Sequence, residues 1–317
     1  MDGMDAIHLR SALEDYSRCM DKFREQAALL ALFRDRKSKW GVLADEIEAS
    51  GSALKTLESS VYGTGQGELF TEEPGTRFEA ELARARTAIS QWAEEGMRLV
   101  TLLDEDYPAQ LLTIHQRPPF LLYRGRLDPA DAGGVAIVGT RKPTDLGLAR
   151  ASAIATGLAQ RAVTVVSGLA EGIDTAAHTA AIAAGGRTVA VIGTGLRRAY
   201  PSVNAGLQDR IAREHLVLSQ FWPDAGPTKT SFPMRNAVMS GYAAATVVIE
   251  AAWKSGARMQ ARLALEHGRP VFLHESLLQH DWAREYQARG AIVVTTADDV
   301  LAALDERLSP QVELVWS

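Results

Sequence analysis

The sequence predicts an α/β protein in which a small helical domain precedes a doubly wound, mostly parallel sheet. Short apolar runs recur from residue 135 onward, and helical patterns separate most of them. The runs are continuously apolar rather than alternating, as parallel strands need when helices cover both faces of their sheet. With 317 residues, 46% of them hydrophobic, the chain can form one large domain and a smaller one.

The first part of the chain is predicted to be helical. Apolar residues recur at helical spacing within residues 6–60, and Gly51 marks a turn between two short helices. Residues 61–76 contain four glycines and a proline, which is typical of an exposed linker. We therefore predict a helical domain with its linker at 1–76 and the main domain at 77–317.

The main domain is predicted to begin with a helix at about 78–95 and strands at 97–102 and 118–125. The regular strands follow at 135–139, 163–167, 188–193, 215–219, 245–250 and 270–273. A strand at 291–295 and a helix at 298–308 complete the pattern. The sequence has no apolar run of about 18 residues, so we expect no membrane-spanning helix.

Composition narrows the class of protein. The N-terminal residues are polar and unlike a secretory signal, and Cys19, the only cysteine, cannot form an internal disulfide. Both features fit a cytoplasmic location. The seven histidines are scattered and no HExxH motif is present, so we predict no metal site. Residues 133–275 carry 15 Lys and Arg against 9 Asp and Glu, in a chain of net charge −5, which indicates a localised anion-binding surface.

Three glycine-bearing loops after successive predicted strands are the candidate phosphate-binding elements. Glycine permits close approach of a ligand to the backbone, helix N-termini favour anions, and loops after parallel strands share one sheet edge. The spacing matches neither a dinucleotide fingerprint nor a P-loop, so we expect no common cofactor. The candidate residues are Gly139, Thr140, Arg141 and Lys142 in the first loop, Ser167, Gly168 and Gly172 in the second, and Gly193 and Gly195 in the third.

Asp174 and His178 lie one helical turn apart behind the second loop, so the two side chains are expected to pair. Such a pair could act as a general base, but only Ser167 is conceivable as its nucleophile. We favour a structural interpretation, in which Asp174 and His178 brace the loop by capping and pairing. The sequence therefore predicts no catalytic constellation and a protein that is not an enzyme.

Residues 221–236 are predicted to form a long loop with three prolines. Lys229 and Arg235 flank Phe232, and Asn236 follows. Basic residues around an exposed aromatic ring suit a single nucleic-acid strand, because the charges hold phosphates and the ring stacks on a base. Alternatively, Phe232 fills the core and Pro233 fixes the entry into the next helix. The residues alone leave both interpretations open.

Several motifs, in order and spacing, resemble the DprA (Smf) family of DNA-processing proteins. The resemblance covers about residues 80–270. The matching segments are Gly139-Thr140-Arg141, Val166-Ser167-Gly168, Gly172-Ile173-Asp174, Ala177-His178, Gly193-Thr194-Gly195-Leu196, Tyr200-Pro201-Ser202-Val203-Asn204, Phe232-Pro233-Met234-Arg235-Asn236, Val248-Ile249-Glu250-Ala251 and Ser255-Gly256.

The resemblance implies an extended Rossmann-like fold that binds single-stranded DNA, often dimerises and helps to load the recombinase RecA onto DNA during natural transformation. It places Arg141, Lys229, Phe232 and Arg235 in the DNA pocket, which the glycine turns at Gly168 and Gly195 would also line. We accordingly expect single-stranded DNA, a RecA-type recombinase or another protein partner, and a second copy of the chain as partners, and no membrane.

The chain departs from the family pattern at several positions, which indicates a divergent member, and we expect a role in transformation, in recombination or on a mobile or defensive element. Ala237 replaces an arginine, residues 257–260 read Ala-Arg-Met-Gln instead of small hydroxyl residues, and no C-terminal winged-helix domain is expected. Two alternatives therefore stay open. One is a nucleotide-binding sensor or phosphoribohydrolase-like enzyme, for which Glu250 is the nearest acid. The other is a regulatory, antitoxin-like protein that has lost DNA binding.

Overall fold

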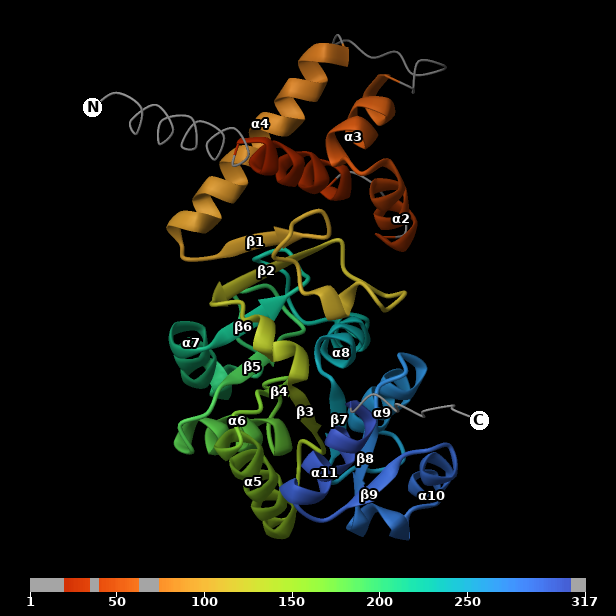
Figure 1. The fold of residues 1–317 in the computed structure, drawn as a ribbon. Coiled ribbons are helices and arrows are strands. Elements are labelled where there is room, and N and C mark those ends of the chain that lie inside the picture. Colours follow the sequence, from red (N-terminus) through yellow and green to blue (C-terminus); the bar gives the residue numbers. More distant parts are fainter. Residues whose placement is uncertain (1–19, 35–39, 63–73, 309–317) are drawn as a thin grey trace, which may run out of the picture. The chain divides into compact units, whose positions relative to one another are not determined.

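The computed structural model of the chain (Figure 1) describes residues 20–34, 40–62 and 74–308. The chain divides into two compact units, one of residues 1–107 and 118–122 and the other of residues 108–117 and 123–317. The first unit contains the helical residues 20–34, α2 (Trp40–Ser50), α3 (Ala53–Tyr62), α4 (Pro74–Glu94) and strand β1 (Arg98–Thr101). The domain boundary at residue 76 stays a prediction.

The helices of the first unit are joined by a turn and packed through aromatic rings. Gly51 has a φ of +65° between α2 and α3, which confirms the predicted turn. The Phe33 ring meets the Trp40 ring edge-on, with 5.4 Å between centroids, and lies 6.1 Å from that of Phe120, which is fully buried. Cys19 and most of the predicted linker lie outside the described residues.

Helix α4 begins earlier than predicted. Its first residue is Pro74, so residues 74–76 are helical although the sequence pattern assigned them to the linker. Proline is well tolerated at the start of a helix, because its missing N–H would have no partner there and its φ already suits the helix. Two of the residues that suggested a linker, Pro74 and Gly75, therefore lie at the start of α4.

The nine-stranded sheet has the order β1-β2-β6-β5-β4-β3-β7-β8-β9. The pairs from β6 across to β9 are all parallel. Successive strands run from β3 to β6 in one direction, and β7 then pairs with the other side of β3, so the sheet is doubly wound as predicted. The remaining strands are β2 (Phe120–Gly125), β3 (Val135–Val138), β4 (Val165–Ser167), β5 (Thr188–Val191), β6 (Leu216–Ser219), β7 (Ala245–Val248), β8 (Val271–His274) and β9 (Ile292–Val294).

Helices cover both faces of the sheet in the second unit. Val135 and Ile137 of β3 pack with buried residues of α5, α6 and α11 in one core cluster. Val138 has the opposite parity and lines a cavity together with residues of α8 and α9, so these helices lie on the other face. The helices of this unit are α5 (Asp145–Gln160), α6 (Ile173–Ala183), α7 (Ala205–Glu214), α8 (Ser231–Tyr242), α9 (Gly256–Glu266), α10 (Asp281–Ala288) and α11 (Ala297–Leu308).

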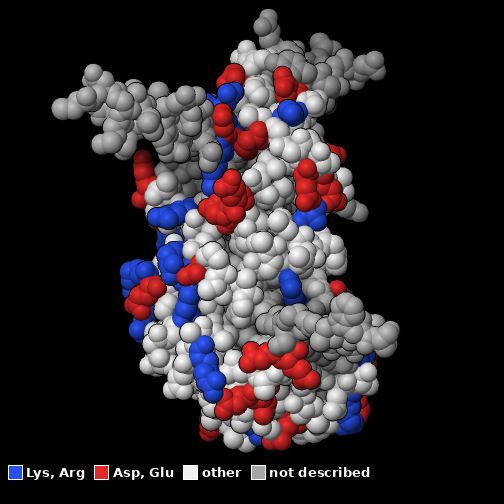
Figure 2. Space-filling view, viewed as in Figure 1, with Lys and Arg blue, Asp and Glu red and all other residues white. Residues whose placement is uncertain are grey.

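Charge is distributed unevenly over the second unit. On the face shown in Figure 2, basic side chains gather over α7 with acidic ones among them, and acidic side chains gather around α11. Part of the charge on α7 is neutralised locally, since Arg210 pairs with Glu214 at 3.0 Å. Among the helices that the structure describes, none is long and apolar enough to cross a membrane.

Candidate anion-binding cavity

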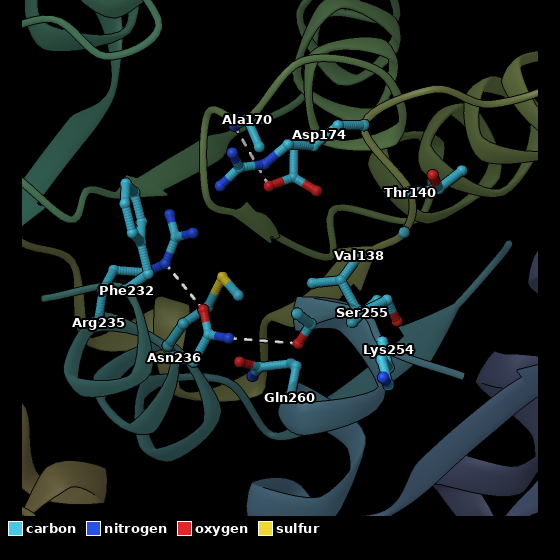
Figure 3. A pocket seen from close by; sticks show the side chains of 15 residues that line it. Val138, Thr140, Ala170, Asp174, Phe232, Arg235, Asn236, Lys254, Ser255 and Gln260 are labelled. Carbon is cyan, nitrogen blue, oxygen red and sulfur yellow. Dashed lines mark hydrogen bonds between the residues drawn. The ribbon is translucent and has the colours of Figure 1, made fainter. Parts of the chain in front are cut away.

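A cavity of about 330 Å³ opens at the carboxyl ends of β3 and β7 (Figure 3). These neighbouring strands are where the order of the sheet reverses, and ligands of doubly wound proteins bind in the crevice at this point. The lining residues come from the end of β3 and the loop after it, the loop after β4, the start of α6, the first three turns of α8, and α9 with the loop before it. They are Val138, Gly139, Thr140, Arg141, Ala170, Asp174, Phe232, Arg235, Asn236, Met239, Lys254, Ser255, Gly256, Ala257 and Gln260.

Phe232 and Arg141 form the open side of the cavity. Arg141 is exposed, and its guanidinium carbon lies 5.3 Å from the centroid of the Phe232 ring. The Tyr200 ring, 43% exposed, lies 5.6 Å from that of Phe232, and both rings line a smaller cavity together with Arg141. The site therefore combines an accessible cation with an aromatic surface.

Phe232 lies on a helix rather than in the predicted loop. Helix α8 begins at Ser231, so Phe232, Arg235 and Asn236 belong to its first turns. Pro233 is tolerated there because the amides of the first turn have no partner within the helix. The aromatic ring packs over Gly193, where a Cβ atom would lie 2.9 Å from the ring. Phe232 is therefore half-buried, packed over Gly193 and also part of the cavity lining.

Arg235 is a buried brace that also reaches the cavity wall. Only 6% of Arg235 is exposed, and its Nη1 donates to the carbonyl oxygens of Gly168 at 2.5 Å and Val191 at 2.9 Å. Its Nε donates to Asn236 Oδ1 at 2.9 Å. Burial lowers the pKa of Arg235, and the charge of Asp174 opposes that shift. Arg235 therefore ties the loop after β4 and the end of β5 to α8.

Asp174 provides a negative charge that acts on the buried guanidinium of Arg235. Its carboxylate accepts hydrogen bonds from the N–H groups of Gly168 at 3.2 Å and Ala170 at 3.3 Å. Burial raises the pKa of Asp174, and the nearby charge of Arg235 and the two N–H groups oppose the shift. The predicted bracing role of Asp174 fits these contacts.

The predicted pairing of Asp174 with His178 is not formed. His178 is fully buried, and its Nδ1 bonds instead to Thr188 Oγ1 at 2.7 Å. Thr188 donates its own proton to Val165 O, so Nδ1 of His178 carries the proton of this bond. Burial lowers the pKa of His178 to about 3, which keeps the ring neutral. Sequence spacing gave the right helical turn but the wrong partner, since His178 faces β4 and β5.

The glycines of the second loop are required by close packing. A Cβ atom on Gly168 would collide with the guanidinium of Arg235. Gly172 has a φ of +82° and lies against the loop after β3, where a Cβ atom would come within 2.5 Å of Thr140 O. Both glycines therefore shape the cavity, and Gly168 also lines its smaller neighbour.

Several predicted binding residues lie away from the main cavity. Ser167 is fully buried and donates to Ile137 O at 2.6 Å, so its hydroxyl joins β4 to β3. Gly195 packs against the backbone of Trp222 and Pro223. Lys142 and Lys229 are exposed and are not among the residues that line the cavity. Gly193 lines the smaller cavity.

Residues of α9 and of the loop before it contribute to the cavity, although none of them was predicted as a binding residue. Lys254, Ser255, Gly256 and Gln260 all line the cavity. Ser255 caps the helix by accepting a hydrogen bond from the N–H of Arg258 at 3.2 Å, so the positive end of the helix dipole lies at the cavity wall. A signal was present in the sequence, because Lys254 and Ser255 follow the predicted strand at 245–250.

Glu250, the acid considered for an enzyme that acts on a nucleotide, has a structural role. Glu250 accepts hydrogen bonds from the N–H of Thr144 at 3.2 Å and from its hydroxyl at 2.9 Å, and so holds the residue that caps α5. Within the described part of the chain, no group of three His, Cys, Asp or Glu side chains is arranged to hold a metal ion.

A doubly wound parallel sheet with a basic, aromatic-lined cavity at its switch point defines a Rossmann-like protein with the groups to bind an anion. The chain belongs to the DNA recombination-mediator protein A family, because the model of that family matches residues 98–305. The matched segment includes all nine strands of the sheet and every residue that lines the cavity. The resemblance to DprA (Smf) proteins is thereby confirmed.

Relatives and solved structures agree with this assignment. The chain is 42% identical over 208 residues to DNA processing protein DprA of Streptococcus pneumoniae, covering 65% of this chain and 73% of that protein. It is 34% identical over 223 residues to the Bacillus subtilis protein of the same name, covering 69% of this chain and 75% of that one.

Two solved structures share the fold. The X-ray structure of DprA from Streptococcus pneumoniae matches with a TM-score of 0.62 and 32% identity, over 89% of this chain and 92% of that one. DNA processing protein A from Helicobacter pylori, whose structure concerns a single-stranded DNA binding mode, matches with a TM-score of 0.58 and 29% identity. That match covers 66% of this chain and 96% of the Helicobacter chain.

Proposed function

We propose that this chain is a single-stranded DNA-binding protein that acts in DNA processing through the cavity at the end of β3 and β7. The observation that carries the proposal is the exposed Arg141 guanidinium beside the Phe232 ring, at 5.3 Å, on the open side of the cavity. The single-stranded DNA binding mode described for the Helicobacter relative supports it.

In this proposal the cavity holds a phosphate and Phe232 holds a base. Arg141 and Lys254 are exposed cations at the cavity, and the N-terminus of α9 adds backbone N–H groups. Arg235 contributes less net charge, because Asp174 neutralises it. Arg141 is therefore the principal phosphate ligand, and the DNA contacts of Lys142, Lys229 and Arg235 are part of the same proposal with smaller expected effects.

The aromatic side of the site favours a single strand over a duplex. A base can stack on Phe232 only if one of its faces is free, which the stacked bases of a duplex do not offer. The partly exposed Tyr200 ring beside Phe232 extends the same surface. We include a RecA-type recombinase partner, homodimer formation and a cytoplasmic location in the proposal, and these rest on the family resemblance and the cysteine content.

The proposal is tested by fluorescence anisotropy with labelled oligo-dT and a duplex of the same length. We expect tighter binding to oligo-dT, and about a ten- to hundredfold loss in Arg141→Ala, as for the loss of a hydrogen bond to a charged group. Arg210→Ala is the matched control, because Arg210 is exposed on α7 and paired with Glu214. Equal affinity of wild type and Arg141→Ala for oligo-dT would remove the cavity as the binding site.

A further inference from the structure

The loop between β7 and α9 carries an aromatic side chain that the cavity does not include. Trp253 is 53% exposed, and the guanidinium carbon of Arg258 lies 3.7 Å from the centroid of its ring. So short a separation is typical of a guanidinium stacked directly on an indole face. About half of Trp253 is therefore accessible to a ligand.

The stacked pair is held in place by the start of α9. Arg258 Nη1 donates to the carbonyl oxygen of Trp253 at 3.3 Å, and the Arg258 N–H donates to Ser255 Oγ at 3.2 Å. These bonds and the stacking restrict both side chains before any ligand arrives. Pre-ordering of this kind lowers the entropic cost of binding.

The pair also lies next to the cavity along the chain. Lys254 and Ser255, the two residues after Trp253, both line the cavity. A polymer that leaves the cavity past Lys254 would meet the indole ring next. The cations Lys254 and Arg258 flank the ring, so this surface suits an anionic chain that carries aromatic groups better than an apolar protein surface.

We propose that Trp253, supported by Arg258, is a second base-stacking platform for the nucleotide that follows the one held in the cavity. This inference rests on the proposed function of the cavity. The strand would then place one base on Phe232 and another on Trp253, with a phosphate between them at Arg141 and Lys254. The contact is made only by a strand long enough to leave the cavity.

The test compares two lengths of thymidine nucleotide, the mononucleotide dTMP, which can enter the cavity but has no following nucleotide, and oligo-dT of about twelve. Trp253→Ala is expected to weaken binding of oligo-dT by about five- to a hundredfold and to leave binding of dTMP within about twofold. Trp253→Phe keeps an aromatic ring and should retain most of the affinity. Arg289→Ala is the matched control, because Arg289 also lies over an aromatic ring, that of Tyr286 at 5.3 Å, on α10 and its end.

Tryptophan fluorescence provides an independent readout. Stacking of a base on Trp253 should quench part of the emission of the wild type as oligo-dT is added, and Trp253→Phe should lose that part while it still binds. Unchanged length dependence in Trp253→Ala, or unchanged quenching in Trp253→Phe, would overturn the inference. A change in oligomeric state of Trp253→Ala without a change in DNA affinity would overturn it too, and would assign the ring to a protein contact.

The two proposals fail in different ways. If wild type does not bind oligo-dT, the proposed function itself fails. If Arg141→Ala weakens binding of oligo-dT and Trp253→Ala does not, the cavity stands and only the second platform is wrong.

Discussion

Replacement of Arg235 by methionine is expected to destabilise the fold strongly, because it leaves the buried carboxylate of Asp174 without its counter-charge. The variant loses the bonds from Arg235 to Gly168 O and Val191 O, at 2.5 and 2.9 Å. Loss of a hydrogen bond from a charged donor costs about 1.5–3 kcal/mol, so we expect a loss of about 3–6 kcal/mol for the two bonds together. Methionine fills similar space, so the loss reflects charge and hydrogen bonds more than a cavity.

The destabilisation should depend on pH with a definite sign. Burial already raises the pKa of Asp174 above its usual value, and loss of Arg235 removes an opposing influence, so the pKa rises further. The folded variant then holds a proton at pH values where the unfolded chain has released it. The stability of the variant therefore falls as pH rises from the pKa of Asp174 in the unfolded chain through its pKa in the folded chain. The loss of stability relative to wild type is larger at about pH 7.5 than at about pH 5.

Urea denaturation of wild type, Arg235→Met, Asp174→Asn and the double variant at both pH values measures these quantities. Asparagine keeps an oxygen that can accept from the N–H groups of Gly168 and Ala170 but carries no charge. The double variant is therefore expected to recover part of the stability that Arg235→Met loses, and to lose the pH dependence. A deficit below about 1 kcal/mol in Arg235→Met that is equal at both pH values would refute the reasoning.

Three further predictions concern neighbouring side chains. Phe232→Ala should weaken oligo-dT binding by about 1–3 kcal/mol, measured by anisotropy, and an unchanged affinity would show that the ring does not stack on a base. Glu250→Gln should cost about 1 kcal/mol in urea denaturation through its bonds to Thr144, with DNA affinity unchanged. If wild type releases base from nucleoside monophosphates and Glu250→Gln does not, the chain is an enzyme after all. Ser167→Ala should cost about 1 kcal/mol by loss of its bond to Ile137 O and bind DNA like wild type, and a tenfold weaker affinity would place Ser167 at the ligand.

The sheet could be predicted from sequence because each of its strands is a local pattern. Continuous apolar runs and the helical patterns between them place all the strands from β1 to β9 within a few residues of where the structure has them. Boundaries were less predictable where proline starts a helix. Pro74 was assigned to the linker, and Pro233 either to the loop or to the entry into the next helix. Both lie in the first turn of a helix.

Residues of the site could be predicted only where they lie together in a local sequence motif. The turn with Arg141 and the segment from Phe232 to Asn236 were found because their residues are adjacent in sequence. The different roles of the basic residues could not be predicted, because these roles depend on burial. Arg235 and Arg141 look alike in sequence, but one is 6% exposed beside Asp174 and the other is exposed at the cavity. The role of Lys254 follows from the pairing of β7 with β3, which joins segments more than a hundred residues apart.

The central claim is that Arg141 contacts a phosphate of single-stranded DNA at the cavity between β3 and β7. It is tested most directly by the slope of log affinity for oligo-dT against log salt concentration, in wild type and in Arg141→Ala. Each phosphate contact releases condensed counterions and contributes about 0.7 to the slope for a single strand. We predict a steep fall in wild type and a slope shallower by about 0.7 in the variant. Identical slopes and affinities for the two proteins would contradict the account.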